Sequence, residues 1–463
     1  MNCRAAILQQ LRDYESRNVT FVDPDGTWPI VWERAQGVHV WDTTGKKYLD
    51  LTAAFGVAAA GHANPRVVKA GQRQMAKLLH AMGDVHPHAL KAQLARELSR
   101  ITFERWSRAS RRDELHESPT SRGPGEYGTR VTRPSGKTIF CNSGFEAVEA
   151  ALKTAILATG KRGIIAFEGA YHGVGYGALN ATHRKHFRGP FRSQLREFGH
   201  FVPFPVVADV SRRIFPDESL RRLTSAATKL FRRERIGAIL VEPIQARGGS
   251  NIPPPEFLPL LRKLCDQHGA LLILDEIYTG FGRTGKWFAC EHSDVVPDLI
   301  CLGKALTGGF PLSACVGRAD LMDAAWPVSR GEAIHTSTFL GHPVGCAMAL
   351  AQIAEIRRRK LVERSARLGE LLLSELQSAI GNRQSAITAR GLGLMAGLEL
   401  RRADGSPDGA TAIKAVKALL RRGFILLPEG GHSNVVTFTP PLVITEQQLL
   451  GTVKALSQSI AKL

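Results

Sequence analysis

Short apolar runs alternate with longer stretches of helical periodicity through the middle of the chain. The runs end in glycine or polar residues, and the stretches between them, such as residues 146–157 and 255–269, repeat apolar positions as a helix does. Five runs share this pattern: 138–141 (TIFC), 163–167 (GIIAF), 238–241 (AILV), 271–274 (LLIL) and 299–302 (LICL). The alternation predicts an α/β fold, in which helices cover both faces of a mostly parallel central sheet.

The two ends of the chain follow other patterns. Residues 31–51 alternate like a β-hairpin with a turn at Thr44-Gly45, and the last part mixes long helices with short strands. We predict one small α+β lobe from residues 1–60 and 341–463, and a large domain from residues 61–340. Residues 107–135 are rich in Ser, Arg, Gly and Pro and nearly lack apolar residues, which predicts an exposed loop.

Composition narrows the class of protein. A chain of 463 residues with 44% hydrophobic residues exceeds the size at which one core usually stops growing. No uncharged apolar run reaches about 18 residues, and acidic residues interrupt the start of the chain, so we expect no membrane span and a cytoplasmic location. The seven cysteines are scattered without a CxxC pair, which argues against a disulfide framework and a zinc site.

The chain is basic, with a formal net charge of +19. Its basic pairs are spread along the whole sequence, and no nucleic-acid-binding module is recognisable. We therefore interpret the charge as solvated surface and expect no nucleic-acid partner, although an anionic substrate or cofactor is compatible with it. The histidines are scattered without metal-ligand spacing, so we expect no metal site.

Side chains that can take part in catalysis follow two of the apolar runs. Asp275 and Glu276 end one run, where at least one of them is desolvated and an unpaired carboxylate needs a partner, usually a cation. Lys304 follows the next run and precedes two glycines. A lysine in such a place has a lowered pKa, which suits Schiff-base formation with an aldehyde. For either residue alone, a structural Asp–Lys ion pair is the better interpretation.

The ends of two other runs favour a ligand site. Ser143, Gly144 and Phe145 open a helix after the first run, and free N–H groups at a helix N-terminus bind phosphate. Tyr171 and His172 follow the second run and bring an aromatic ring to the same edge of the sheet. Together with the carboxylate and the lysine, these groups suit a flat, phosphorylated pyridine that carries an aldehyde.

At this point the sequence resembles a known family. DEIYTGFGRTG at 275–285, followed by Lys304, is similar to the class III, fold type I aminotransferases that use pyridoxal 5′-phosphate, and the resemblance runs from about Gly37 to the end. It implies that Lys304 holds the cofactor as a Schiff base and shuttles the proton between substrate and cofactor. It also implies that Asp275 pairs with the pyridinium nitrogen and keeps it protonated, so that the ring absorbs the carbanion electrons.

The resemblance assigns further residues by position. Ser143, Gly144 and Phe145 match the phosphate-binding turn, and Glu242 matches a glutamate near the substrate. Thr338 matches a threonine that reaches the phosphate from the other subunit, which implies a homodimer with active sites at the interface. The residues at the ring itself are Tyr171, which stacks on the pyridine, its neighbour His172, and Ile277 on the opposite face.

Several positions depart from the family pattern. Val174 and Thr437 stand where relatives that use 2-oxoglutarate often carry arginines, and the loss of a bidentate carboxylate contact is difficult to replace with a neutral side chain. Phe55 and Tyr278, expected at the substrate, replace a tyrosine and a glutamine. We therefore expect an amine or ω-aminotransferase with pyruvate or alanine favoured over 2-oxoglutarate or glutamate, unless Arg184 or Arg188 supplies the missing contact.

Other functions remain open at this stage. A racemase, an aminomutase or an amine-phosphate lyase on the same scaffold needs the same Lys304 and Asp275, because fold and cofactor do not fix the reaction. A transaminase leaves the amino group on the cofactor, whereas a racemase or lyase returns the cofactor unchanged. A nucleic-acid-binding or structural protein that had lost catalysis is a weaker hypothesis, since Lys304, Asp275 and the phosphate turn are all present.

Overall fold

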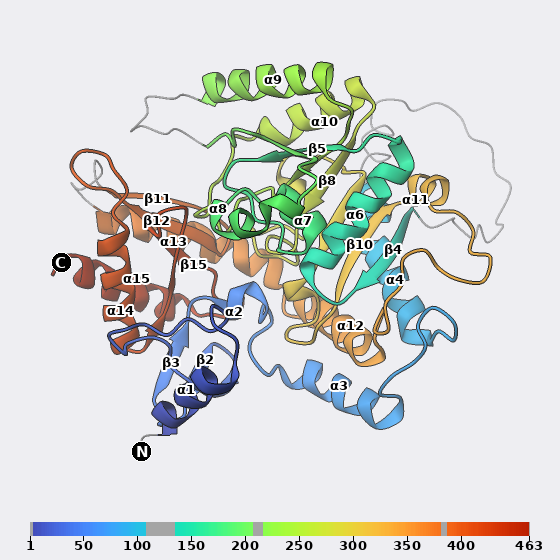
Figure 1. The fold of residues 1–463 in the computed structure, drawn as a ribbon. Coiled ribbons are helices and arrows are strands. Elements are labelled where there is room, and N and C mark those ends of the chain that lie inside the picture. Colours follow the sequence, from blue (N-terminus) through green and yellow to red (C-terminus); the bar gives the residue numbers. More distant parts are fainter. Residues whose placement is uncertain (1–2, 108–134, 207–215, 381–386, 463) are drawn as a thin grey trace, which may run out of the picture.

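The computed structural model describes residues 3–107, 135–206, 216–380 and 387–462 (Figure 1). The loop predicted at 107–135 lies outside the described residues except at its two ends.

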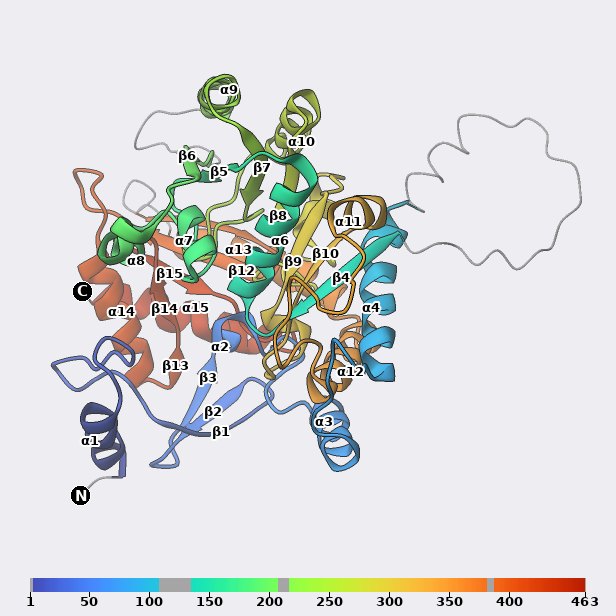
Figure 2. The same cartoon turned by 45° about the vertical axis from the view of Figure 1, so that its right-hand side comes forward.

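A seven-stranded sheet forms the centre of the molecule (Figure 2). In spatial order its strands are β4 (Gly136–Cys141), β10 (Ser313–Arg318), β9 (Leu299–Leu302), β8 (Leu271–Asp275), β7 (Ile236–Val241), β5 (Gly163–Phe167) and β6 (Gly199–Val202). Neighbours from β9 to β6 are parallel, and β10 is antiparallel to both β4 and β9. The predicted fold class, a mostly parallel sheet covered by helices, is therefore confirmed.

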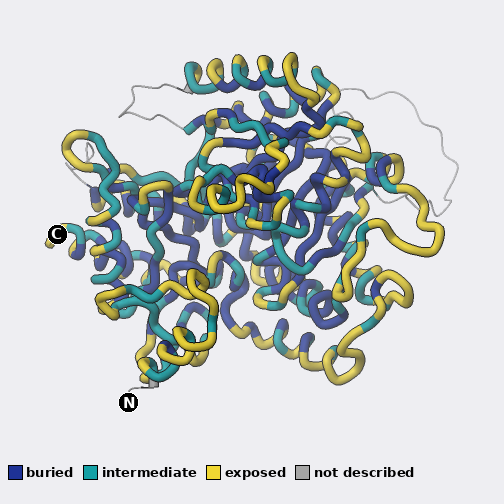
Figure 3. The backbone as a smooth tube through the Cα atoms, viewed as in Figure 1, coloured by how far each residue is buried: buried dark blue, intermediate teal, exposed yellow. Residues whose placement is uncertain are grey.

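Side chains alternate along the strands and face two separate cores, because successive residues of a strand point to opposite faces. Ile164 and Ala166 pack in the core beneath one set of helices, and Ile165 and Phe167 pack in the other. The first set is α6 (Gly144–Thr159), α7 (Tyr176–Ala181) and α11 (Ala319–Ala325). The second set includes α4 (Ala89–Ile101), α9 (Pro216–Arg233) and α10 (Phe257–His268). In Figure 3 the strands between these layers are the most deeply buried part of the chain.

The five apolar runs coincide with β4, β5, β7, β8 and β9, whereas β6 and β10 were not predicted. The sequence of β10, SACVGR, contains small residues and follows a glycine-rich stretch, so it lacks the bulky pattern of a strand. Its strand conformation comes from its position between β4 and β9, which supply backbone hydrogen bonds on both sides. The strand conformation of β10 therefore depends on tertiary contacts, which the local sequence pattern does not predict.

The two chain ends meet in a second sheet. β1 (Trp32–Gln36), β2 (His39–Asp42) and β3 (Lys47–Asp50) form a three-stranded meander in place of the predicted hairpin, and β13 (Phe424–Ile425) pairs with β3 in parallel. A third sheet contains β11 (Ile387–Leu392), β12 (Met395–Leu400), β15 (Val435–Phe438) and β14 (Leu427–Glu429). The predicted domain boundaries at residues 60 and 340 stay a prediction.

The remaining helices connect these sheets. α12 (Pro343–Arg358) packs on α3 (Pro65–Lys77) and α4. The others are α1 (Cys3–Tyr14), α2 (Ala53–Gly56), α8 (Lys185–Arg188), α13 (Leu361–Ile380), α14 (Gly409–Arg421) and α15 (Glu446–Ile460), with short 3-10 turns η1 (Gly189–Gln194), η3 (Ala289–His292) and η4 (Lys304–Leu306). No helix in the described part of the chain is long and apolar enough to cross a bilayer.

Candidate active site

A cavity of about 230 Å³ opens beside the carboxyl ends of β5, β7, β8 and β9. Ligands of open α/β sheets bind at this edge of the strands. Its walls bring together nine of the predicted site residues: Gly144, Phe145, Tyr171, His172, Glu242, Asp275, Ile277, Tyr278 and Lys304. Gly173, Val174, Ala246 and Arg247 complete the lining.

Asp275 and His172 form a buried pair at the floor of the cavity. His172 Nδ1 lies 2.8 Å from Asp275 Oδ2, and the backbone N–H of Ile277 donates to Asp275 Oδ1 at 3.1 Å. The backbone N–H of His172 donates to the Thr182 hydroxyl at 2.9 Å, which fixes the segment that carries the imidazole. These contacts hold one carboxylate in a single orientation at the end of β8.

Glu276, the next residue, lies outside the cavity lining and is completely buried. Its oxygens accept hydrogen bonds from the Thr279 hydroxyl and from the backbone N–H groups of Ala289 and Cys290. The expectation that a buried carboxylate here takes a cationic partner is wrong for Glu276, because neutral donors satisfy it. Burial raises its pKa to about 7.

Lys304 lies on the short turn after β9 with a left-handed backbone (φ 35°), a strained conformation for a residue with a side chain. Burial lowers the pKa of its ammonium, while Asp275 and Glu242 act in the opposite direction. The Nζ atom lies 4.6 Å from the centre of the Tyr278 ring. Within the described residues no ion pair joins Lys304 to Asp275, so the alternative of a structural Asp–Lys pair has no support in the geometry.

The turn that opens α6 forms one end of the cavity. The Glu146 carboxylate accepts from the backbone N–H groups of Asn142 and Ser143 at 2.6 and 3.1 Å. The Ser143 hydroxyl is buried and caps the first turn of α6 with Glu146, but its proton has no acceptor among the residues that the structure describes. A Cβ on Gly144 would lie 3.0 Å from the Ile277 side chain. The turn therefore combines a buried hydroxyl that can still donate with a helix N-terminus, as a phosphate site requires.

Glu242 follows β7 and is held by backbone groups. Its oxygens accept from the N–H groups of Tyr171 at 3.0 Å and Ala246 at 3.2 Å. Its pKa is raised to about 7, mainly by burial; the charge of Asp275 acts in the same direction, whereas His172 and the two backbone N–H groups oppose it. No arginine makes an ion pair with Glu242 in the described part of the chain.

Three predicted residues lie outside the lining: Ser143, Phe55 and Thr338. Phe55, in α2, is half exposed with φ 61°, next to Gly56, where a Cβ would lie 3.1 Å from the Tyr278 ring. Thr338 is exposed in the segment before α12, whose Ser337 hydroxyl accepts from the Asn142 amide at 3.4 Å.

The arginines near the cavity differ from expectation. Arg184 and Arg188 both lie outside the lining. Arg184 donates to the Gly430 carbonyl at 3.5 Å, and the guanidinium carbon of Arg188 lies 4.8 Å from the Phe201 ring centre. Arg247, which was not among the predicted site residues, lines the cavity itself. The sequence could have predicted this residue, because Arg247 follows Glu242 in the segment directly after an apolar run. The acidic Glu429 beside it gave no signal, since it comes from the opposite end of the chain.

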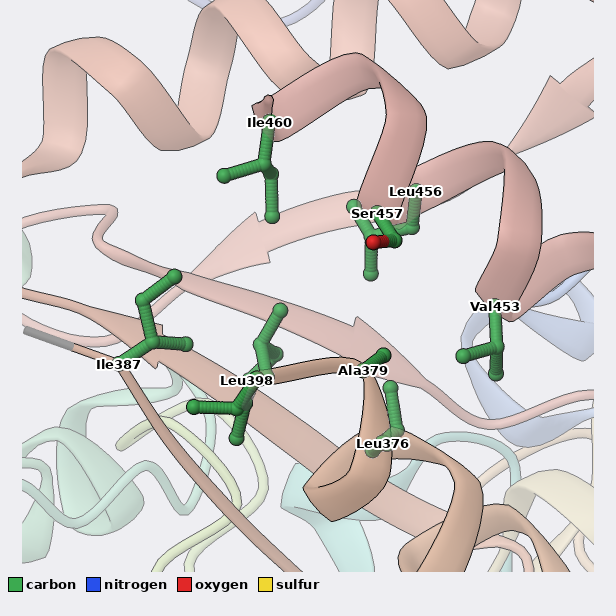
Figure 4. A pocket seen from close by; sticks show the side chains of 9 residues that line it. Leu376, Ala379, Ile387, Leu398, Val453, Leu456, Ser457 and Ile460 are labelled. Carbon is green, nitrogen blue, oxygen red and sulfur yellow. The ribbon is translucent and has the colours of Figure 1, made fainter. Parts of the chain in front are cut away.

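A second pocket, shown in Figure 4, lies between α13, α15, β11 and β12. Its lining is aliphatic apart from Ser457, and it encloses only about 20 Å³. It contains no titratable group and is not a candidate active site. Among the described residues no cluster of three or more His, Cys, Asp or Glu side chains suits a metal ion.

Known proteins are similar to this chain over nearly its whole length. The sequence pattern of the family described as Aminotransferase class-III matches residues 21–460. An acetylornithine aminotransferase of Methanosarcina mazei is 36% identical over 434 residues, 94% of this chain and 92% of its own. A putrescine aminotransferase of Pectobacterium atrosepticum is 36% identical, covering 96% of this chain and 85% of its own.

Solved structures agree. An (S)-enantioselective ω-transaminase of Thermomicrobium roseum superposes with a TM-score of 0.85 and 25% identity, covering 100% of this chain and 99% of that one. The cavity at the strand ends, the matched family pattern and these relatives lead to one conclusion: the chain belongs to the class III aminotransferases and uses pyridoxal 5′-phosphate.

Proposed function

We propose that this enzyme transfers an amino group from an amine or an ω-amino donor, with pyruvate or alanine favoured over 2-oxoglutarate or glutamate as the second partner. The observation that carries the proposal is Val174 in the cavity wall, at a position where relatives that use 2-oxoglutarate often carry an arginine. Thr437, at the second such position, donates its hydroxyl to the Leu427 carbonyl and offers no charge. A dicarboxylate therefore loses two cationic contacts.

The residues of the cavity fit the cofactor. The Ser143 hydroxyl and the N-terminus of α6 would hold its phosphate, and Tyr171 and Ile277 would flank its ring. Pyridoxal 5′-phosphate, when bound, supplies an aldehyde for the amino group and a ring that takes up the electron pair of the substrate carbon. Asp275, oriented by His172, would bind the ring nitrogen.

Lys304 has the properties of a proton carrier in this reaction. Its burial lowers the pKa of the amine, so a larger fraction of it is neutral and able to accept a proton near neutral pH. The Lys304 side chain reaches the cavity from the turn after β9, and Glu242 lines the same cavity. We assign to Lys304 both the covalent attachment of the cofactor and the movement of the proton at the substrate carbon.

The acidic groups of the cavity support a cationic donor. Glu242 carries no arginine partner among the described residues, so its carboxyl group is available to an ammonium group of the substrate. The relative named putrescine aminotransferase is consistent with a diamine donor, and the relative named acetylornithine aminotransferase with an ω-amino group on a longer chain. The substrate class proposed here covers both.

We also propose that the enzyme is a cytoplasmic homodimer in which Thr338 reaches the phosphate site of the partner. Thr338 and the apolar side chains Ile334 and Phe339 around it are exposed. Phe339 packs on His80, close to the exposed Leu79 and Met82. An apolar patch of this kind is typical of a surface that another subunit covers.

A single-turnover absorbance experiment tests the donor class. The cofactor-loaded enzyme is mixed in turn with alanine, with glutamate and with a primary amine that has no carboxylate. The proposal expects the absorbance band of the lysine-bound cofactor to disappear with alanine and with the simple amine, and to persist with glutamate. Conversion by glutamate at a rate comparable to that with alanine contradicts the proposed partner preference. Return of the band without pyridoxamine phosphate points to a racemase or lyase.

A further inference from the structure

Arg247 is the one arginine among the residues that line the cavity, and the preceding assignments leave it without a role. It lies in the loop after β7, where its guanidinium carbon is 4.7 Å from the centre of the Tyr171 ring and 5.6 Å from that of Phe187. Contact with two aromatic faces restricts the guanidinium group without using its N–H donors. About a third of the side chain is exposed, so the group is accessible to a ligand.

Within the described structure Arg247 has one counterion, Glu429, and the contact between them is long. Its Nε atom lies 3.7 Å from Glu429 Oε2, beyond hydrogen-bond distance. The same Nε atom is buried, and no hydrogen-bond partner for it exists in the part of the chain that is described. A buried guanidinium donor without a partner is costly, so Arg247 is poorly satisfied inside the protein, and the exposed part of its guanidinium group is where a ligand acceptor meets it.

The surroundings of this pair carry excess positive charge. Arg184 lies close enough to Arg247 and Glu429 that their charges affect its pKa in opposite directions. The buried Glu429 carboxylate thus lies within the electrostatic range of two guanidinium groups. Lys304 also senses both Arg247 and Glu429, which places the pair within electrostatic reach of the amine that meets the substrate. Burial raises the pKa of Glu429, so its negative charge is itself destabilised.

We propose that Arg247 is the substrate-carboxylate-binding residue of this active site, and that Glu429 is the counterion from which a keto acid or amino acid carboxylate takes it over. The inference deepens the proposed function and rests on it: pyruvate and alanine need one cation, which Arg247 provides after the loss of arginines at 174 and 437. A donor without a carboxylate leaves the Arg247–Glu429 pair undisturbed, so one cavity accepts both classes of substrate.

The test measures carboxylate binding apart from turnover. Propionate, a carboxylate without an amino or keto group, is titrated into the cofactor-loaded enzyme by calorimetry. Arg247→Gln is expected to weaken propionate binding by about 10- to 100-fold, the range for a lost hydrogen bond to a charged group. Arg247→Lys is expected to restore only part of it, because lysine lacks the planar fork.

Two further variants separate binding from architecture. Glu429→Gln removes the competing counterion, so it is expected to strengthen propionate binding and lower the KM for pyruvate several-fold. A merely structural role of the pair predicts weaker binding in both variants. Arg192→Gln, which removes an exposed arginine paired with Glu197, controls for the change of net charge.

The outcomes of the two proposals are distinguishable. The role of Arg247 is overturned if Arg247→Gln binds propionate as tightly as wild type. It is also overturned if the rate of this variant with the carboxylate-free amine falls as much as its affinity for pyruvate. If wild-type enzyme reacts readily with glutamate but Arg247→Gln still loses propionate binding, the preference for pyruvate fails and Arg247 remains the carboxylate site. If the wild-type enzyme reacts with the amine and with alanine, but Arg247→Gln binds propionate as well as wild type, the proposed function stands and the role of Arg247 fails.

Discussion

Asp275 and Glu276 are adjacent in the sequence but have separate environments, because successive side chains at the end of a strand point to opposite faces. Asp275 faces the cavity and meets the imidazole of His172 at 2.8 Å. Glu276 points into the protein and is satisfied by backbone N–H groups. Only the first is in a position to act on a ligand. The second is a structural group whose ionisation bears on stability.

The Glu276 carboxyl predicts a pH dependence of folding. Its pKa is about 7 in the folded protein against 4.5 for an unperturbed side chain. The folded state therefore keeps a proton that the unfolded state releases. The resulting stabilisation is complete below pH 4.5 and is lost as the pH rises through 7, about 3 kcal/mol in all. Glu276→Gln removes this contribution, so its free energy of unfolding is expected to fall less than that of wild type between pH 5 and 7.5.

Urea unfolding of the cofactor-loaded protein at the two pH values provides the measurement. Glutamine loses one of the backbone contacts, so the variant is less stable at pH 5; the informative quantity is the change with pH. Glu363→Gln, at an exposed position in α13, controls for the loss of a surface carboxyl group. An equal fall in the two proteins would show that Glu276 is ionised in the folded state.

Among the elements, the segment between β5 and α7 packs against the start of α6. We therefore expect a substitution in this segment to weaken cofactor binding. Gly173 has φ 105°, and a Cβ there would lie 2.3 Å from the Phe145 Cβ. Gly173→Ala is therefore expected to displace the turn that opens α6 and to weaken pyridoxal 5′-phosphate binding by at least about tenfold, the effect of one lost hydrogen bond to a charged phosphate. The dissociation constant is measured by fluorescence titration of the apoenzyme.

Gly160→Ala provides the matched control. Gly160 also has a positive φ, of 64°, at the other end of α6, but nothing lies within 4 Å of a Cβ there. It is expected to lower the free energy of unfolding by about 1 kcal/mol through backbone strain and to leave cofactor binding unchanged. Equal cofactor affinities of the two variants would mean that the turn tolerates the shift of Phe145.

The sequence predicted these elements where local pattern and chemistry agree. The strands that carry Asp275 and Tyr171 are bulky apolar runs, and the residues that end them have recognisable chemistry. β10 was missed because its small residues become a strand only between two partners. The pairing of Arg247 with Glu429 was missed for a related reason. One residue follows β7 and the other ends β14, and only the folded chain brings them together.

At the scale of the whole molecule, both chain ends join one sheet, in which β13 pairs with β3. The C-terminal part also supplies Glu429 next to the cavity. The cavity itself is lined by residues between 144 and 304, and the C-terminal part borders it through Glu429. The exposed Thr338 does not line the cavity of its own chain, which is consistent with the proposal that it serves the partner's.

A heterodimer test decides whether Thr338 acts across an interface. Lys304→Ala is expected to abolish transamination, and Thr338→Asp is expected to repel the cofactor phosphate by placing a negative charge against it. When the two variants are co-expressed with different tags, the purified heterodimer contains one site with an intact lysine from one chain and an intact threonine from the other. Such a dimer is expected to have about half the wild-type activity, since one of two sites in a symmetric dimer is complete.

The opposite result has an equally definite meaning. If Thr338 acted within its own chain, the heterodimer would contain one site without the lysine and one with the aspartate, and it would be as inactive as the Thr338→Asp homodimer. A heterodimer of wild type with Lys304→Ala, which keeps one complete site under either arrangement, fixes the value expected for half activity. The activity of the Lys304→Ala and Thr338→Asp heterodimer, compared with this value, therefore shows which chain supplies the threonine.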